Sequence, residues 1–130
     1  MTSVLVRHAS AGDRDDWDGD DRLRPLDGRG RRQAAELVDR LRGIEVRRIV
    51  SSPYVRCVET VEPLAGALGL SVEQDDRLAE GAGRASLDLL REDGVVGCTH
   101  GDVVDAVLGR GLKKGAAAVL DDGVVVRELP

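Results

Sequence analysis

Residues 3–9 read SVLVRHA and residues 95–100 read VVGCTH. Each is a short apolar run that ends at a histidine, and these are the two histidines of the chain. Apolar runs of this length between polar segments predict strands buried on both faces, as in a parallel sheet. A third run, VRRIVS at residues 46–51, predicts another strand. Ser52 and Pro53 follow it and favour the start of a helix.

Helical patterns separate the predicted strands. Asp27 is expected to cap a helix that extends to about Arg42, with its apolar positions on one face. A second helix should extend to Gly69, with a kink or interruption at Pro63. Further elements are expected as a strand at 70–74, helices at 85–92 and 102–110, and a hairpin of 116–120 with 123–129 around an Asp-Gly turn. The pattern predicts the α/β class: a three-layer α/β/α sandwich with a mostly parallel central sheet and a C-terminal hairpin.

Length and composition limit the possible classes of protein. The 130 residues predict a single domain over 1–130, and 42% hydrophobic with 33% charged residues argues against disorder. A net charge of −5 argues against nucleic-acid and anionic-membrane partners. Two cysteines make no disulfide framework, and neither a signal peptide nor a membrane-length apolar run is visible, so a cytoplasmic protein is expected. Because Met1 lies just before the first strand, we expect a free-standing protein.

Basic and imidazole side chains follow three of the predicted strands. Arg7 and His8 end the first strand, His100 ends the strand at 95–100, and Arg56 lies in the helix that follows VRRIVS. Ligands of parallel sheets bind beyond the carboxyl ends of the strands, so these side chains should converge there. Two guanidiniums, two imidazoles and a helix N-terminus attract anions, and a guanidinium can bind two oxygens of one phosphoryl group. The sequence therefore predicts a phosphoryl-binding site.

Several segments together resemble one family. In chain order they are LVRHASAG (5–12), RPLDGRG (24–30), SSPYVRCVET (51–60), RLAEG (77–81) and CTHGD (98–102). They resemble the histidine phosphatase superfamily, which is phosphoglycerate mutase-like, and within it the small SixA-like branch. Ala9 departs from the glycine that usually follows the Arg-His pair. The resemblance implies the α/β sandwich expected above.

The resemblance also implies a mechanism. His8 would be the nucleophile and would form a phosphohistidine intermediate, while Arg7, Arg56 and His100 hold the phosphoryl group. Glu80 would be the general acid. Neither a metal nor another cofactor is expected, because the guanidiniums stabilise the charge. The expected substrates are a phosphorylated small molecule, as a phosphomonoester, or a phosphohistidine protein.

Some positions have two readings. Glu80 lies in a polar loop, where a solvated carboxylate is common, and the SixA-like branch often lacks this acid. Ser10 stands where relatives commonly have Glu, and it either donates to phosphate or caps the loop. Trp17 lies in the acidic loop 13–21, and it either stacks on a nucleobase or packs over that loop. The acidic loop fails the EF-hand spacing and is expected to be solvated.

Two other functions stay open. A non-catalytic phosphate-binding module would keep the arginines and lose His8 or His100, and both are present. A phosphatase acting on nucleotides as the partner of a Nudix-type hydrolase is the other, since similar domains are fused to such hydrolases. About twenty residues separate Glu80 from His100, which leaves little chain for a lid. An open site favours a phosphatase over a mutase.

Overall fold

A six-stranded sheet forms the centre of the molecule. The computed structural model describes residues 1–130. The strands lie in the order β3-β2-β4-β1-β5-β6. Their bounds are Thr2–Arg7 (β1), Arg48–Ser51 (β2), Val72–Gln74 (β3), Val95–Thr99 (β4), Ala117–Asp121 (β5) and Val124–Leu129 (β6). The first four strands of the order are parallel to one another. Strand β5 pairs antiparallel with β1 on one side and with β6 on the other. The predicted mostly parallel sheet with a C-terminal hairpin is confirmed.

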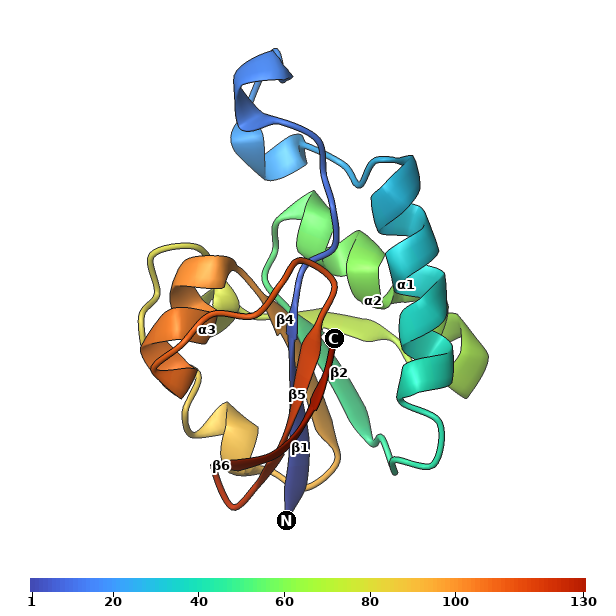
Figure 1. Ribbon diagram of the computed structural model, residues 1–130, viewed down its shortest axis with the longest axis vertical. Helices are drawn as coiled ribbons and strands as arrows, with labels where there is room; N and C mark the ends of the chain where they lie inside the picture. Colours follow the sequence, from blue (N-terminus) through green and yellow to red (C-terminus); the bar gives the residue numbers. More distant parts are fainter.

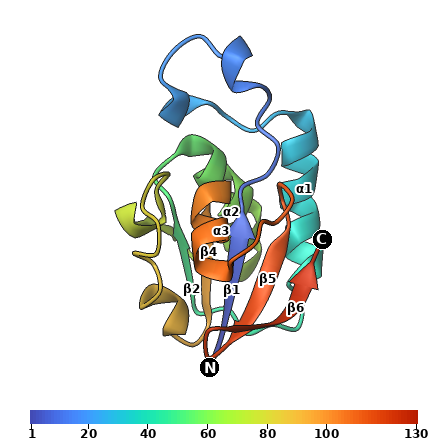
Figure 2. The same cartoon turned by 60° about the vertical axis from the view of Figure 1, so that its left-hand side comes forward.

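Helices cover both faces of the sheet, as Figures 1 and 2 show. The helices α1 (Gly28–Arg40) and α2 (Val55–Leu68) lie on one face, and α3 (Gly101–Leu108) lies on the other. Strand β1 serves both layers because its side chains alternate: Val4 and Val6 join the larger core beside α1 and α2, and Leu5 joins the core beside α3. The three-layer sandwich is thus confirmed. None of the helices combines the length and the apolar character that a membrane crossing requires.

Turn and cap chemistry sets the ends of several elements. Asp27 caps α1, and its Oδ1 accepts a hydrogen bond from the backbone nitrogen of Gly30 at 2.8 Å. Asp122 and Gly123 connect β5 to β6 with φ values of 50° and 83°. Both values are left-handed, as a two-residue hairpin turn of this twist requires. These two predictions are confirmed.

Two expectations about helices are wrong. The helix predicted at 85–92 is a series of turns that ends in a short 3-10 helix, Leu89–Arg91. Leu89 and Leu90 are adjacent yet pack into different cores, which one α-helical face does not permit. Pro63 does not interrupt α2, which continues to Leu68. Apolar side chains on both sides of Pro63 stay buried against the sheet, and this packing holds the helix together.

Candidate active site

Two parallel strands bring the histidines together. Arg7 of β1 pairs with Thr99 of β4, so His8 and His100 leave the sheet at the same level. The backbone nitrogen of His8 donates to the carbonyl oxygen of Thr99 at 2.9 Å. The centroids of the two imidazole rings are 5.5 Å apart. The sheet edge therefore places both rings in one cavity, as the sequence predicts.

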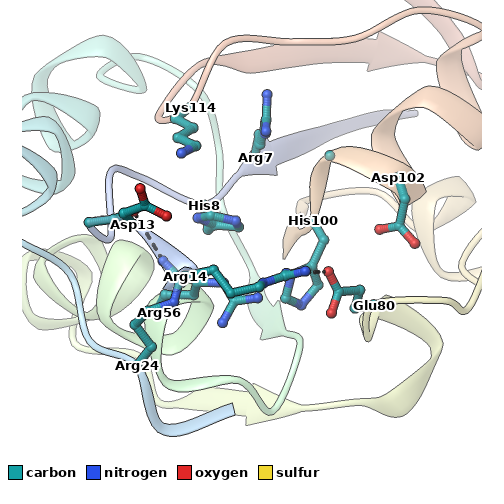
Figure 3. A pocket seen from close by; sticks show the side chains of 12 residues that line it. Arg7, His8, Asp13, Arg14, Arg24, Arg56, Glu80, His100, Asp102 and Lys114 are labelled. Atoms are coloured by element: carbon teal, nitrogen blue, oxygen red, sulfur yellow. Dashed lines mark hydrogen bonds and ion pairs between the residues drawn. The ribbon is translucent and has the colours of Figure 1, made fainter. Parts of the chain in front are cut away.

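This cavity, called here the phosphoryl cavity, has a volume of about 720 Å³. No apolar side chain lines it (Figure 3). The lining residues are Arg7, His8, Gly12, Asp13, Arg14, Arg24, Arg56, Glu80, His100, Gly101, Asp102 and Lys114. Five of the residues predicted from sequence are thus brought together, and Ser10 is not among them. No group of three or more His, Cys, Asp or Glu side chains is arranged to hold a metal ion.

His8 is buried in its neutral form. Its Nδ1 lies 2.8 Å from the carbonyl oxygen of Ala9. A carbonyl oxygen only accepts, so Nδ1 carries the hydrogen and the lone pair is on Nε2. The pKa of His8 is lowered to about 3, mainly by burial and also by the nearby charges of Arg56, His100 and Arg7, while the Ala9 hydrogen bond acts in the opposite direction. The ring is therefore an unprotonated base at neutral pH.

His100 is held from the side of α2. Its Nε2 lies 2.9 Å from Oγ of Ser52 and 3.5 Å from Sγ of Cys57. The ring of Tyr54 packs edge-on against it at 4.5 Å between centroids. The expectation that Ser52 caps the helix is wrong, because Tyr54 is the N-cap and makes no side-chain cap. The Ser52 hydroxyl contacts His100 instead.

Arg56 is almost completely buried, with 1% of its surface exposed. Asp21 fixes its guanidinium twice: the carbonyl oxygen accepts from Nη1 at 2.8 Å and Oδ2 lies 3.1 Å from Nη2. Asp21 also pairs with Arg24 at 3.0 Å and with Arg14 at 3.4 Å. Burial raises the pKa of the Asp21 carboxyl, but the three arginines outweigh burial and the net shift is downward. Asp21 is thus the common counterion of three arginines.

The acidic loop is therefore only partly the solvated segment that its composition predicts. It contains two short 3-10 helices, Arg14–Asp16 and Asp21–Leu23, and the second delivers Asp21 to the arginines. Trp17 stays outside the phosphoryl cavity, and its Nε1 donates to the carbonyl oxygen of Asp20 at 2.9 Å. This contact fits the interpretation that Trp17 packs over its own loop.

Glu80 and Ser10 differ in their placement. Glu80 lines the phosphoryl cavity, and its Oε1 accepts from Nη2 of Arg14 at 2.9 Å. Ser10 is turned away, and its hydroxyl donates to Oδ2 of Asp27 at 2.7 Å. The position of Ser10 fits loop capping, and Glu80 lies in the wall of the cavity beside Arg14.

Sequence reasoning missed three cationic residues of the cavity: Arg14, Arg24 and Lys114. Arg24 had a signal, since it begins the RPLDGRG segment, and its Nη1 donates to the carbonyl oxygen of Ala11. Arg14 and Lys114 have none. Arg14 lies between two aspartates and Lys114 lies between Lys113 and Gly115, and only the folding of two loops onto the sheet edge selects them.

Three nitrogens of side chains that line the phosphoryl cavity are buried and have no hydrogen-bond partner: Nε of Arg7, Nε of Arg56 and Nδ1 of His100. Such atoms are rare because an unpaired buried donor is costly. The backbone makes room for one of these residues, because a Cβ at Gly101 would lie 3.0 Å from the guanidinium of Arg7. The site accumulates positive, under-bonded groups around a neutral imidazole, which is the arrangement of an anion-binding catalytic site in an α/β protein.

Comparison with known proteins assigns that site to a family. Residues 3–88 match the model of the histidine phosphatase superfamily, branch 1. The chain belongs to this superfamily.

Relatives of known sequence or structure agree. The chain is 37% identical over 116 residues to the 8-oxo-(d)GTP phosphatase of Mycolicibacterium smegmatis, a match that covers 82% of this chain and 36% of that protein. It is 32% identical over 81 residues to the probable phosphoglycerate mutase GpmB of Salmonella choleraesuis, covering 58% of this chain and 36% of that protein. The chain thus spans about a third of the length of these relatives.

The fold is shared with solved SixA structures. The protein histidine phosphatase SixA complexed with tungstate superposes with a TM-score of 0.77 and 25% identity, covering 99% of this chain and 96% of that one. A SixA from Nakamurella multipartitia, described as a phosphohistidine phosphatase, has a TM-score of 0.77 and 23% identity, covering 95% and 86%. The similarity to the small SixA-like branch predicted from sequence is confirmed.

Proposed function

We propose that the chain hydrolyses a phosphate ester or a phosphohistidine through a covalent intermediate on His8. The observation that carries this proposal is the protonation of His8. A neutral ring with its hydrogen fixed on Nδ1 has a lone pair on Nε2 at the wall of a cationic cavity. A protonated imidazole could not attack phosphorus, so this chemistry requires the neutral form of His8 that its buried, hydrogen-bonded position favours.

The reaction has two steps. Nε2 of His8 attacks phosphorus, the bond from phosphorus to the leaving atom breaks, and that atom, the ester oxygen or the ring nitrogen of phosphohistidine, takes the electron pair and is protonated. Water then attacks the phosphohistidine, loses its proton, and the N–P bond breaks to release phosphate and neutral His8. Glu80 is the proposed donor of the first proton and acceptor of the second.

The cationic groups stabilise the charge that spreads over the phosphoryl oxygens. Arg7, Arg56 and His100 are proposed to donate hydrogen bonds to these oxygens. The buried, unpartnered nitrogens of these three side chains support this role, since an anionic oxygen would supply the missing acceptors. Arg24, which sequence reasoning did not select, lines the same cavity.

The relatives support a phosphorylated substrate of two kinds. One relative is named for 8-oxo-(d)GTP and the SixA neighbours for phosphohistidine. A phosphorylated small molecule and a phosphohistidine protein are therefore both candidates. Because the chain covers about a third of the nucleotide phosphatase, partnership with a Nudix-type hydrolase is a second proposal on the same site.

A substrate screen with chemical trapping tests the proposed function. The protein is mixed with an aryl phosphate, sugar phosphates, nucleotides and a phosphohistidine peptide, with and without a strong chelator. We expect turnover that survives the chelator, and brief mixing with labelled substrate should leave acid-labile phosphate on the peptide that contains His8. Failure to turn over any substrate, or label on another residue, would contradict the mechanism. Chelator-sensitive turnover would move the chain to a different kind of hydrolase.

The role of Glu80 is tested by leaving-group dependence. Glu80→Gln should slow hydrolysis of an alkyl or sugar phosphate by about 10²–10⁴-fold, because an alkoxide must be protonated as it leaves. A nitrophenyl phosphate should be slowed much less, because nitrophenolate leaves unprotonated. The measurement is kcat/KM for the two esters in parallel.

A matched variant separates proton donation from loss of the ion pair. Arg14→Gln also breaks the contact between Arg14 and Glu80 but keeps the carboxyl group. It should not reproduce the strong dependence on leaving group. If Glu80→Gln slows both esters equally and slightly, Glu80 is a loop residue and takes no part in proton transfer.

A further inference from the structure

A second cavity of about 490 Å³ adjoins the phosphoryl cavity. It is called here the lysine cavity, and its lining is Ser10, Arg29, Gln33, Glu36, Arg40, Lys113, Lys114 and Pro130. Lys114 lines both cavities, so they are contiguous at that side chain. Figure 3 shows Lys114 directed over His8, opposite Glu80. The two cavities therefore meet at Lys114, the residue that Figure 3 places beside His8.

Most of the positive charge of this cavity is unpaired. Arg29, Lys113 and Lys114 take part in no ion pair, whereas Arg40 pairs with Glu36 at 3.2 Å. Lys113 and Lys114 are also the two lysines of a chain that carries 24 acidic and 19 basic residues. Carboxylates are abundant, yet none lies within ion-pair distance of these three cations. The arrangement leaves their charge available for an anion from outside.

Helix α1 forms one side of the same cavity, and the carboxylate of Asp27 caps its N-terminus. Arg29 lies in its first turn, which contains no acidic residue. A cation at a helix N-terminus opposes the helix dipole, so the local sequence disfavours this placement. Violations of local preference are expected at functional sites, where binding outweighs their cost in stability.

The backbone that carries the two lysines is held firmly. The Gly115 nitrogen donates to the carbonyl oxygens of Arg7 and His8, each at 3.1 Å. Gln33 donates through Nε2 to the carbonyl oxygen of Lys114 at 3.2 Å and accepts at Oε1 from the Ser10 nitrogen at 2.8 Å. Gly115 has a φ of 82°, and a Cβ there would lie 3.0 Å from Gln33. The lysines thus project from a loop tied to the backbone of His8 itself.

We propose that Arg29, Lys113 and Lys114 form a second anion subsite, which binds a second phosphate of a small-molecule substrate. This inference rests on the proposed function: the terminal phosphoryl group lies at His8, and the next phosphate lies at Lys114 and beyond. Charged and polar side chains make up most of the lining of both cavities, and Pro130 is the one apolar residue in the lining of the lysine cavity. The recognised chemistry is the second phosphate, in a phosphoanhydride chain or in a bisphosphate ester.

A protein substrate fits this subsite less well. Protein partners are held by a buried apolar or aromatic centre with a polar rim. The lysine cavity is instead a polar recess with concentrated positive charge, which suits a compact anion. A phosphohistidine protein is therefore an outcome that the experiment must be able to reveal.

Calorimetric titration tests the subsite without requiring turnover. The His8→Ala protein is titrated with orthophosphate and pyrophosphate, and with a hexose monophosphate and a hexose bisphosphate. The same titrations follow in an Arg29→Gln/Lys113→Gln background, since both side chains are exposed and line the lysine cavity but not the phosphoryl cavity. We expect the two-phosphate ligands to bind at least tenfold more tightly than their one-phosphate partners, and the double variant to remove most of that advantage.

Arg32→Gln is the matched control, because Arg32 is an exposed cation of α1 that lines neither cavity. It should leave the advantage intact. If the double variant loses the tighter binding of pyrophosphate alone, the subsite is assigned to phosphoanhydrides. If it loses the tighter binding of the hexose bisphosphate alone, the subsite is assigned to esters. No advantage for either ligand, or equal loss in Arg32→Gln, overturns the subsite. Preferred turnover of a phosphohistidine protein that the double variant leaves unchanged also overturns it. None of these results affects the trapping of phosphate on His8, which tests the proposed function separately.

Discussion

Hydrolysis of an aryl phosphate should fall by a factor on the order of 10⁴ or more when His8 is replaced by alanine. The Nε2 lone pair is the proposed nucleophile, and an activated leaving group does not substitute for it. The arginines would still bind phosphate, so binding of orthophosphate should persist while turnover is lost. The measurement is kcat with the aryl ester, beside calorimetric titration with orthophosphate. Turnover comparable to that of the unmodified chain would refute the mechanism.

Acid unfolding provides a control that the same variant must satisfy. The pKa of His8 is about 3 in the folded chain and about 6.5 when unfolded, so the unfolded chain binds one more proton between these values. Stability therefore falls as the pH is lowered from 6.5 towards 3. His8→Ala removes this dependence and should lose less stability on acidification. A melting series from pH 7 to pH 4 checks that the variant is folded and that the neutral ring is a property of the fold.

The second large effect is expected at Gly30, in the first turn of α1. A Cβ there would lie 1.9 Å from the carbonyl oxygen of Ser10 and 2.9 Å from its carbonyl carbon. No rotamer relieves a collision between a Cβ and a backbone, so either α1 or the segment after His8 must move. Gly30→Ala should destabilise the fold by about 3 kcal/mol and lower Tm by roughly 10 °C. Because Ser10 lies two residues after His8, kcat/KM should also fall, by roughly 10²-fold.

Gly66→Ala is the matched control for this substitution. Gly66 is exposed in α2, and a Cβ there meets no atom within 4 Å. The same change should stabilise the fold by about 0.5–1 kcal/mol, as expected for Gly→Ala in a helix interior. Thermal unfolding of both variants, with activity measured below both transitions, compares them. A Gly30→Ala protein that melts and works like the Gly66→Ala protein would contradict the close packing of α1 on Ser10.

The part of the site that sequence reasoning predicts is the part that strand ends determine. His8 and His100 each end an apolar run, and parallel pairing of β1 with β4 then brings them to one edge. The two edge strands of the sheet, β3 and β6, and the Asp-Gly turn also follow from local patterns. Register and turn chemistry act over a few residues, so they are visible in the sequence.

The remainder depends on contacts between distant residues. The Ser52 hydroxyl looks like a helix cap locally, yet it contacts a ring 48 positions away. Asp21 belongs to a segment whose composition predicts solvation, and its role appears only when Arg56 is buried beneath it. Charged residues are frequent in this chain, so sequence spacing alone does not select which of them meet at the cavity.

The carboxylate of Asp21 lies behind the cavity wall and pairs with three of the arginines that line it. A phosphate that enters therefore exchanges partners with a resident group: Arg14, Arg24 and Arg56 divide their hydrogen bonds between Asp21 and the newcomer. Part of the attraction is already satisfied before binding, which weakens the hold on free phosphate as much as on substrate. Under the proposed function, in which inorganic phosphate leaves after every cycle, this sharing of hydrogen bonds favours departure of the product.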